Sequence, residues 1–155
     1  MMKKKIAGIV SVVLLALGVA ACGPKVTKEA MKCTLEQEGV STVMYADAEG
    51  DKITQLTQVT TIDLSDMPDE NKEYIDSVID ATKEQVSGIN GVDYNVDEKD
   101  GVYTETFVMN VKDNLDEIVD SGIVPIETEG DQDVKYLSVD GTKQALEAAG
   151  WTVEK

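Results

Sequence analysis

The sequence predicts an α+β domain, a two-layer sandwich in which a mainly antiparallel sheet carries amphipathic helices on one face. Two observations support this fold class. Alternating or β-branched segments are separated by tight turns, which favours antiparallel pairing of neighbouring strands. Segments with apolar residues at helical spacing lie between and after them. The expected order is three strands, a helix, two strands and two further helices.

The first three strands are expected over residues 32–38, 40–46 and 52–64. The turn between the second and third contains Gly50, which can adopt a positive φ. The third strand is rich in Thr and Gln, and its apolar residues change parity, which predicts a bulge or a strand with two apolar faces. Cys33 alternates with polar neighbours in the first strand, so we expect it to be buried as a small hydrophobe.

A helix is expected to start at Ser65-Asp66-Met67-Pro68, with Ser65 or Asp66 as the cap and Pro68 in the first turn, and to end at Gly88. Its apolar stripe is expected to pack on the core, and consists of Tyr74, Ile75, Val78, Ile79, Thr82 and Val86.

The second half of the chain begins with a hairpin of residues 92–97 and 102–111 around an Asp-Gly turn. A short helix capped by Asn114 and an extended segment over residues 123–126 are expected next. A polar loop over 127–133, a short strand over 134–137 and a helix from Ser138 to Ala149 then follow. Trp151 comes directly after that helix and is expected to pack back on the core.

The N-terminal segment is typical of a bacterial export signal that ends in a lipidation site. Three lysines in residues 3–5 precede an apolar run over residues 6–20, which is shorter than the roughly 20 residues needed to span a bilayer. The run ends in Val19-Ala20-Ala21-Cys22, which resembles the bacterial lipobox, with Val where Leu is usual. The resemblance implies cleavage between Ala21 and Cys22, a diacylglycerol thioether on Cys22, and acylation of its amino group, for example by palmitate.

These features predict the domain organisation and the location of the protein. Residues 1–21 are expected to be removed as a signal peptide, residues 22–29 to form a lipidated tether, and residues 30–155 to form one α+β domain. The protein is then expected at the cell membrane, anchored by lipid, on the extracytoplasmic face. An ordinary signal peptide with a chance cysteine and an uncleaved anchor are the alternatives.

The charge excludes one class of function. The chain has 30 acidic and 14 basic residues, no histidine, and a net charge of −16; without the three lysines of the signal segment the charge is −19. Such a surface repels nucleic acid phosphates, so we expect no nucleic-acid partner. Lipidation of Cys22 would leave Cys33 as the only thiol, which excludes an intrachain disulfide.

Motifs for catalysis and metal binding are incomplete, so the chain is not expected to be an enzyme or to hold a cofactor. Without histidine and without a Ser-x-x-Lys motif, a serine nucleophile has no base. Asp120-Ser121-Gly122 resembles the aspartic-protease signature, but that chemistry needs two aspartates. Asp93, Asn95 and Asp97 have the spacing that opens an EF-hand loop, but Glu98 and Thr104 stand where that loop needs Gly and Glu. Two looser oxygen clusters are candidates for weak calcium binding: Asp47/Glu49/Asp51 and Asp97/Glu98/Asp100.

Several segments together resemble the YehR-like family of small bacterial lipoproteins. They are the lipobox, Gly50-Asp51-Lys52 before a Thr/Gln-rich strand, the segment 88–92, the strand segment 103–106, and Ala148-Ala149-Gly150-Trp151. The resemblance implies an α+β fold with helices on a sheet and a lipid anchor. The biochemical function of that family is uncharacterised, so the resemblance implies no catalytic residue.

The sequence therefore predicts a membrane-anchored lipoprotein with a non-enzymatic binding domain. Its partner, a protein, peptide or small ligand, is expected close to the membrane surface because the tether is short. The alternatives are a surface module that binds calcium or another cation, suggested by the acidic charge, and a carboxylate-based hydrolase of cell wall or glycans.

Overall fold

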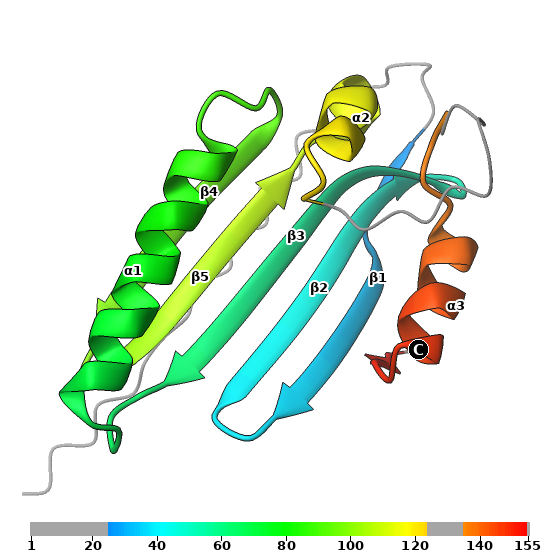
Figure 1. The fold of residues 1–155 in the computed structure, drawn as a ribbon. Helices are drawn as coiled ribbons and strands as arrows, with labels where there is room; N and C mark the ends of the chain where they lie inside the picture. The colour runs from blue at the N-terminus through cyan, green and yellow to red at the C-terminus, as the bar shows by residue number, and fades with distance from the viewer. Residues whose placement is uncertain (1–24, 124–134, 155) are drawn as a thin grey trace, which may run out of the picture.

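The computed structural model describes residues 25–123 and 135–154, and these form a sheet with helices on one side (Figure 1). The sheet has six strands in the order β4-β5-β3-β2-β1-β6, and every pairing is antiparallel. This confirms the predicted α+β sandwich. The elements are β1 (Val26–Gln37), β2 (Val40–Glu49), β3 (Lys52–Asp63), α1 (Asp69–Val86), β4 (Val92–Lys99), β5 (Val102–Met109), α2 (Val111–Asp120), α3 (Val139–Ala148) and β6 (Thr152–Val153).

The three helices pack on the same face of the sheet and bury it in two clusters. The larger cluster lies beneath α2 and α3 and contains Met31, Cys33, Ala46, Ala48, Ile53, Leu56, Met109, Val111, Leu115, Ile118 and Val139. In the smaller cluster, Ile79 of α1 packs with Leu64 and Tyr103. Cys33 is a free thiol with an exposed fraction of 0%, which confirms its predicted burial, and burial raises the pKa of this thiol.

The predicted bulge in the third strand lies at Thr54. Gln55 pairs with Asp47 and Ile53 pairs with Ala48, so Thr54 has no partner on β2. The extra residue shifts the alternation by one position, and therefore Ile53 and Leu56 both point toward the helices although their sequence parity differs. A larger irregularity lies in β1, where residues 28–30 face only Asp47 of β2.

Three expected element starts differ from the structure. The predicted caps of α1 were wrong: the helix begins after Pro68, while Ser65 donates its N–H and hydroxyl to the carboxylate of Asp63 at 3.0 and 2.6 Å. Asn114 does not cap α2 but lies inside it at a kink, because the helix already begins at Val111. β1 begins at Val26, within the stretch predicted to be tether, because Val26 and the next residue pair with the end of β2.

The C-terminal segment follows the prediction more closely. Ser138 caps α3 by accepting the N–H of Gly141 at 3.1 Å, as expected. Residues 135–137 form no strand, but Leu137 accepts the N–H of Ile53 at 2.9 Å. Trp151 packs on the larger cluster, and β6, which the sequence did not predict, pairs with β1. The lipobox, the polar loop and most of the segment expected to be extended over 123–126 lie outside the described residues.

The β4–β5 hairpin turn packs against the connection between β3 and α1. Gly101 in this turn has a φ of +81° and accepts the N–H of Leu64 at 2.9 Å. A Cβ on Gly101 would lie 2.9 Å from the Cα of Ser65, which real contacts do not reach. Gly50 in the β2–β3 turn also has a positive φ, +64°, but a Cβ there would meet no atom within 4 Å.

We expect Gly101→Ala to destabilise the domain more than Gly50→Ala. Both substitutions place a side chain at positive φ, which costs about 1–2 kcal/mol. Only Gly101→Ala adds a backbone overlap, which raises its cost by about 1–3 kcal/mol. Urea unfolding of the two variants measures the difference, and equal losses of unfolding free energy would contradict the docking of this turn.

Candidate functional site

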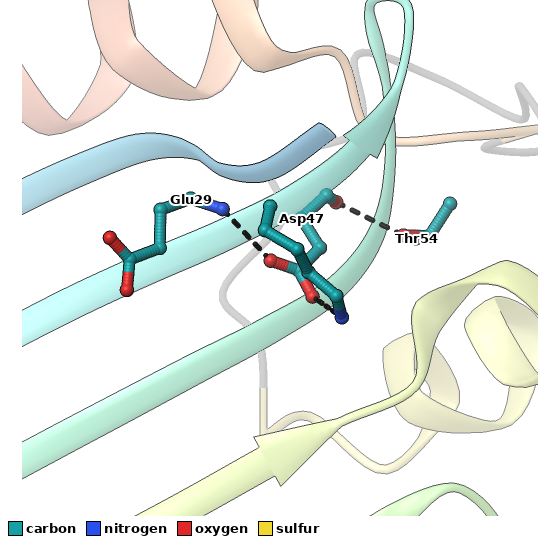
Figure 2. A network of polar contacts seen from close by, with 4 residues as sticks. Glu29, Asp47 and Thr54 are labelled. Atoms are coloured by element: carbon teal, nitrogen blue, oxygen red, sulfur yellow. Dashed lines mark hydrogen bonds and ion pairs between the residues drawn. The ribbon is translucent and has the colours of Figure 1, made fainter. Parts of the chain in front are cut away.

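The end of the sheet where the described chain begins carries a set of polar contacts between distant segments. Val26 at the start of β1 pairs with Glu49 at the end of β2. Next to this pair, Asp47 faces the three bulged residues of β1 and lies beside the bulge of β3 (Figure 2). We call this region, with Lys28, Asp47, Glu49, Asp51 and Lys112, the entry end.

Asp47 joins the first three strands. Its carboxylate accepts the Lys28 Nζ at 2.5 Å and the Glu29 N–H at 3.0 Å. Its backbone carbonyl accepts the Thr54 hydroxyl at 3.2 Å (Figure 2). Burial acts to raise the pKa of the Asp47 carboxyl, but the Lys28 ammonium and the Glu29 N–H outweigh it and hold this pKa below its ordinary value. The carboxylate therefore remains charged in the gap that the β1 bulge opens.

The other two acidic residues of the entry end bind two helices. Glu49 accepts the Lys112 Nζ of α2 at 2.6 Å. Asp51 accepts the Asp140 N–H of α3 at 3.1 Å through its side chain and the Val139 N–H at 2.8 Å through its backbone. The Ser138 hydroxyl and the Asp140 N–H lower the pKa of the Asp51 carboxyl, because both stabilise its charged form.

These contacts account for an acidic group that the sequence offered as a loose cation site. Asp47, Glu49 and Asp51 each have a partner within the chain, and those partners lie in β1, α2 and α3. In the described part of the chain, no three acidic or Cys side chains come together in a way that would hold a metal ion. The entry end is therefore a structural joint between the first three strands and two helices.

A second feature lies on the helix-bearing face, in the middle of the strands. Its residues point to the same side as the buried core residues, yet they are only half-buried. We call this set the central strip, and it consists of Leu35, Thr42, Met44, Gln58, Glu105 and Phe107. The helices thus leave part of this face accessible, with both apolar and polar groups on it.

Polar residues of the strip are held by contacts across the strands. Glu105 accepts the Tyr94 hydroxyl from β4, and the Tyr94 ring lies 4.5 Å from the ring of Phe107. Burial and the neighbouring Glu105 carboxylate strongly raise the pKa of Tyr94, so this hydroxyl stays protonated and donates. The buried Thr60 accepts the Gln58 amide at 3.4 Å and lies 3.3 Å from the Thr42 hydroxyl. The strip therefore combines apolar side chains with polar side chains that are held in place by hydrogen bonds.

The other candidate residues of the sequence occupy separate places. Ala21 and Cys22 lie outside the described residues. Asp93, Asn95 and Asp97 are exposed along β4, with Val92, Tyr94 and Val96 on its other face. Asp120 ends α2, and Ser121 donates its hydroxyl to the carbonyl of Ile118 at 2.6 Å, so the protease-like segment is a helix terminus.

The central strip was missed from the sequence, although an indication was present. Glu105 has the same parity as Tyr103, Phe107 and Met109, so it is a charged residue at an inward-pointing position. Gln58 and Thr60 likewise share the parity of the buried Leu56. Polar residues at inward positions of an amphipathic strand indicate either a buried network or an accessible part of that face.

Fold and sequence comparisons agree on the class of protein. The domain is a small antiparallel sheet with helices on one face, and residues 29–152 match the family described as a protein of unknown function, DUF1307. The chain belongs to this family. It is 27% identical over 150 residues to the uncharacterized lipoprotein Lmo0207 of Listeria monocytogenes, covering 97% of this chain and 95% of that protein. It is 29% identical over 103 residues to the uncharacterized lipoprotein Lin0239 of Listeria innocua, covering 66% of each chain.

Two solved structures share the fold. The NMR structure of the E. coli YehR protein matches with a TM-score of 0.64 at 16% identity, over 83% of this chain and 92% of that chain. An NMR structure of a protein from Streptococcus pneumoniae TIGR4 matches with a TM-score of 0.53 at 11% identity, over 99% of both chains. The resemblance to YehR-like lipoproteins is confirmed. None of the helices in the described segments has the length and apolarity needed to cross a membrane.

We expect Asp47→Asn to weaken the entry end. The substitution keeps the shape but removes the charge that Lys28 and the Glu29 N–H bind, which should lower the free energy of unfolding by about 1 kcal/mol at pH 7. The folded state holds the pKa of Asp47 below its ordinary value of about 3.9, so its stabilisation is present above that pH and is lost as the pH falls through the lowered pKa.

Denaturant unfolding between pH 7 and pH 3 measures this effect, with Asp93→Asn as the control. Asp93 is exposed on β4, and its substitution removes the same charge from the same acidic chain. The loss of stability on acidification should be smaller in Asp47→Asn than in the wild type and unchanged in Asp93→Asn. If both variants behave alike, Asp47 has no special role in joining the strands.

Proposed function

We propose that this protein is a lipoprotein anchored through Cys22, and that its domain binds a partner on the extracytoplasmic face of the membrane without catalysing a reaction. The proposal rests mainly on the Val19–Cys22 lipobox together with the lipoprotein names of the two Listeria relatives. A thioether-linked diacylglycerol supplies two acyl chains, and two chains are what stable anchoring requires.

The fold supports a short connection between the lipid and the domain. β1 begins at Val26, so only residues 23–25 separate Cys22 from the sheet. Four residues from 22 to 25 span at most about 14 Å. The entry end therefore lies close to the lipid headgroups, and the contacts of Asp47 fix the start of β1 to the rest of the sheet.

The central strip is the surface that we assign to the partner. Leu35, Met44 and Phe107 supply apolar contact area, and the fixed Gln58 and Glu105 supply hydrogen-bonding groups, which is the usual composition of a binding surface. Glu105 is the only acidic residue of the strip, and its carboxylate already accepts a hydrogen bond from the Tyr94 hydroxyl. A carboxylate-based hydrolase needs two carboxyl groups about 5–10 Å apart, so the strip favours binding over hydrolysis.

Anchoring predicts different behaviour for the two cysteines. We expect Cys22→Ala to abolish the incorporation of a palmitate analogue and to release the protein from the membrane fraction, because the thioether cannot form. Cys33→Ala should leave both properties unchanged, because this thiol is buried in the core. Metabolic labelling, cell fractionation and mass spectrometry of the N-terminal peptide measure the outcome. Normal labelling and membrane retention of Cys22→Ala would rule out the anchor.

Partner binding on the central strip predicts that Met44 is protected from oxidation. Met44 lies in the strip, whereas Met67 precedes α1 and has an exposed fraction of 39%. We expect hydroxyl-radical oxidation of Met44 to be several-fold slower in intact cells than in the purified lipoprotein, because the partner covers it. Oxidation of Met67 should be similar in both samples. Peptide mass spectrometry provides the rates, and equal changes at both methionines would contradict binding at the strip.

A further inference from the structure

The sheet face opposite the helices has an uncharged centre. Strands β2, β3 and β5 each place three residues there, in register across the sheet. We call these nine residues the grid; its rows are Ser41-Thr61-Thr104, Val43-Val59-Thr106 and Tyr45-Thr57-Val108. All nine are half-exposed, and none belongs to either buried cluster or packs against one.

Charged residues on this face surround the grid. Asp47 of β2 and Asp63 of β3 lie just beyond its two ends. Lys32 and Glu36 of β1 flank one side, and Asp93, Asp97 and Lys99 of β4 flank the other. The chain as a whole carries 30 acidic residues and a net charge of −16, so nine neighbouring uncharged positions are a marked departure from the rest of the surface. Loss of charge at the centre with a polar rim is the composition of a protein–protein interface.

We propose that the grid is the interface of a homodimer in which two copies pack sheet against sheet. Charge is the first argument for a second copy. A cationic or anionic partner would be matched by charged groups at the centre of the face, and the grid has none. Two copies of a strongly acidic chain, in contrast, repel each other least where the centres of their facing surfaces carry no charge.

The geometry of the sheet also suits self-association. β3 lies in the middle of the five long strands, with β5 and β4 on one side and β2 and β1 on the other. A two-fold axis along β3 therefore places β2 of one copy over β5 of the other and Val59 near Val59. At the rim, Lys32 comes opposite Asp93 and Glu36 opposite Asp97. Asp63, exposed at the end of β3, comes opposite its own copy, and exposed pairs of this kind contribute little in either direction.

The size of the face is that of a specific interface. Five strands spaced about 4.8 Å apart and about nine residues long cover roughly 700 Å². A standard interface buries about 800 Å² on each partner. Aligned sheets pack about 10 Å apart with their strands crossing at about 30°, which the half-exposed Val and Thr side chains of the grid can fill.

The tether selects between the two possible directions of the axis, an argument that rests on the proposed anchor at Cys22. An axis along the strands keeps the start of β1 at the same end in both copies. An axis across the strands would separate the two starts by the length of β1, about 40 Å for its 12 residues. Residues 22–25 reach only about 14 Å, so with the strands upright on the membrane only the first arrangement lets both lipids enter it.

Cysteine cross-linking of the full-length protein in bacterial membranes tests the proposal. Val59→Cys should form a disulfide-linked dimer on oxidation, because the two copies bring this position together. Val78→Cys is the matched control, since Val78 is exposed on α1 and lies away from the grid. We expect at least tenfold more dimer from Val59→Cys than from Val78→Cys. Equal cross-linking of both variants, or monomeric Val59→Cys, would overturn the dimer.

Two further measurements distinguish a missing interface from a folding defect in the Val59→Cys variant. Co-expressed copies with Tyr45→Cys and with Val108→Cys should cross-link to each other, because β2 lies over β5. Val43→Glu should abolish the Val59→Cys dimer, whereas Val78→Glu should leave it intact. If these mixed copies stay monomeric or Val43→Glu has no effect, the interface is wrong. Fractionation of the same samples reports anchoring separately, since failed lipidation gives soluble protein and a failed interface gives anchored monomers.

Discussion

The fold depends on Asp47, which lies between two bulged strands and binds both of them. Residues 28–30 bulge away from β2 on one side of Asp47, and Thr54 bulges from β3 on the other. Each bulge removes regular ladder bonds, which would be costly if the freed groups had no partner. The carboxylate of Asp47 accepts the Glu29 N–H within the first bulge, and its carbonyl accepts the Thr54 hydroxyl of the second. One residue thus stabilises both irregularities.

The Thr54 bulge in turn decides which side chains form the core. Without the extra residue, either Ile53 or Leu56 would point away from the helices, because their positions differ in parity. Both are buried, with exposed fractions of 3%. The bulge also brings the start of β3 to the segment before α3, where Ile53 donates its N–H to Leu137. The packing of α3 therefore depends on the Thr54 bulge in β3.

The sequence predicts most of this architecture because most of its determinants are local. The inward residues of the α1 stripe, the Asp-Gly turn before β5 and the Ser138 cap each act within a few residues. The stripe was predicted too wide, because Tyr74 and Val78 are exposed and do not pack on the core. The start of β1 was missed because its first residues do not alternate, and they do not alternate because the bulge interrupts them. β6 has two residues, and only its pairing with Cys33 and Thr34 makes it a strand. The central strip depends on where the helices end, which no local pattern specifies.

The two faces of the sheet have different chemistry and therefore different proposed roles. The helix-bearing face offers the central strip, where Glu105 and Gln58 are held in place beside apolar groups. The opposite face offers a wide uncharged area without a fixed polar group at its centre, which suits sheet packing better than recognition of a small ligand. In a dimer formed through the grid, the two central strips face outward on opposite sides. A lipid-anchored pair would then present two equivalent binding surfaces next to one membrane, and a partner with two matching sites would bind more tightly through the raised effective concentration than either surface alone allows.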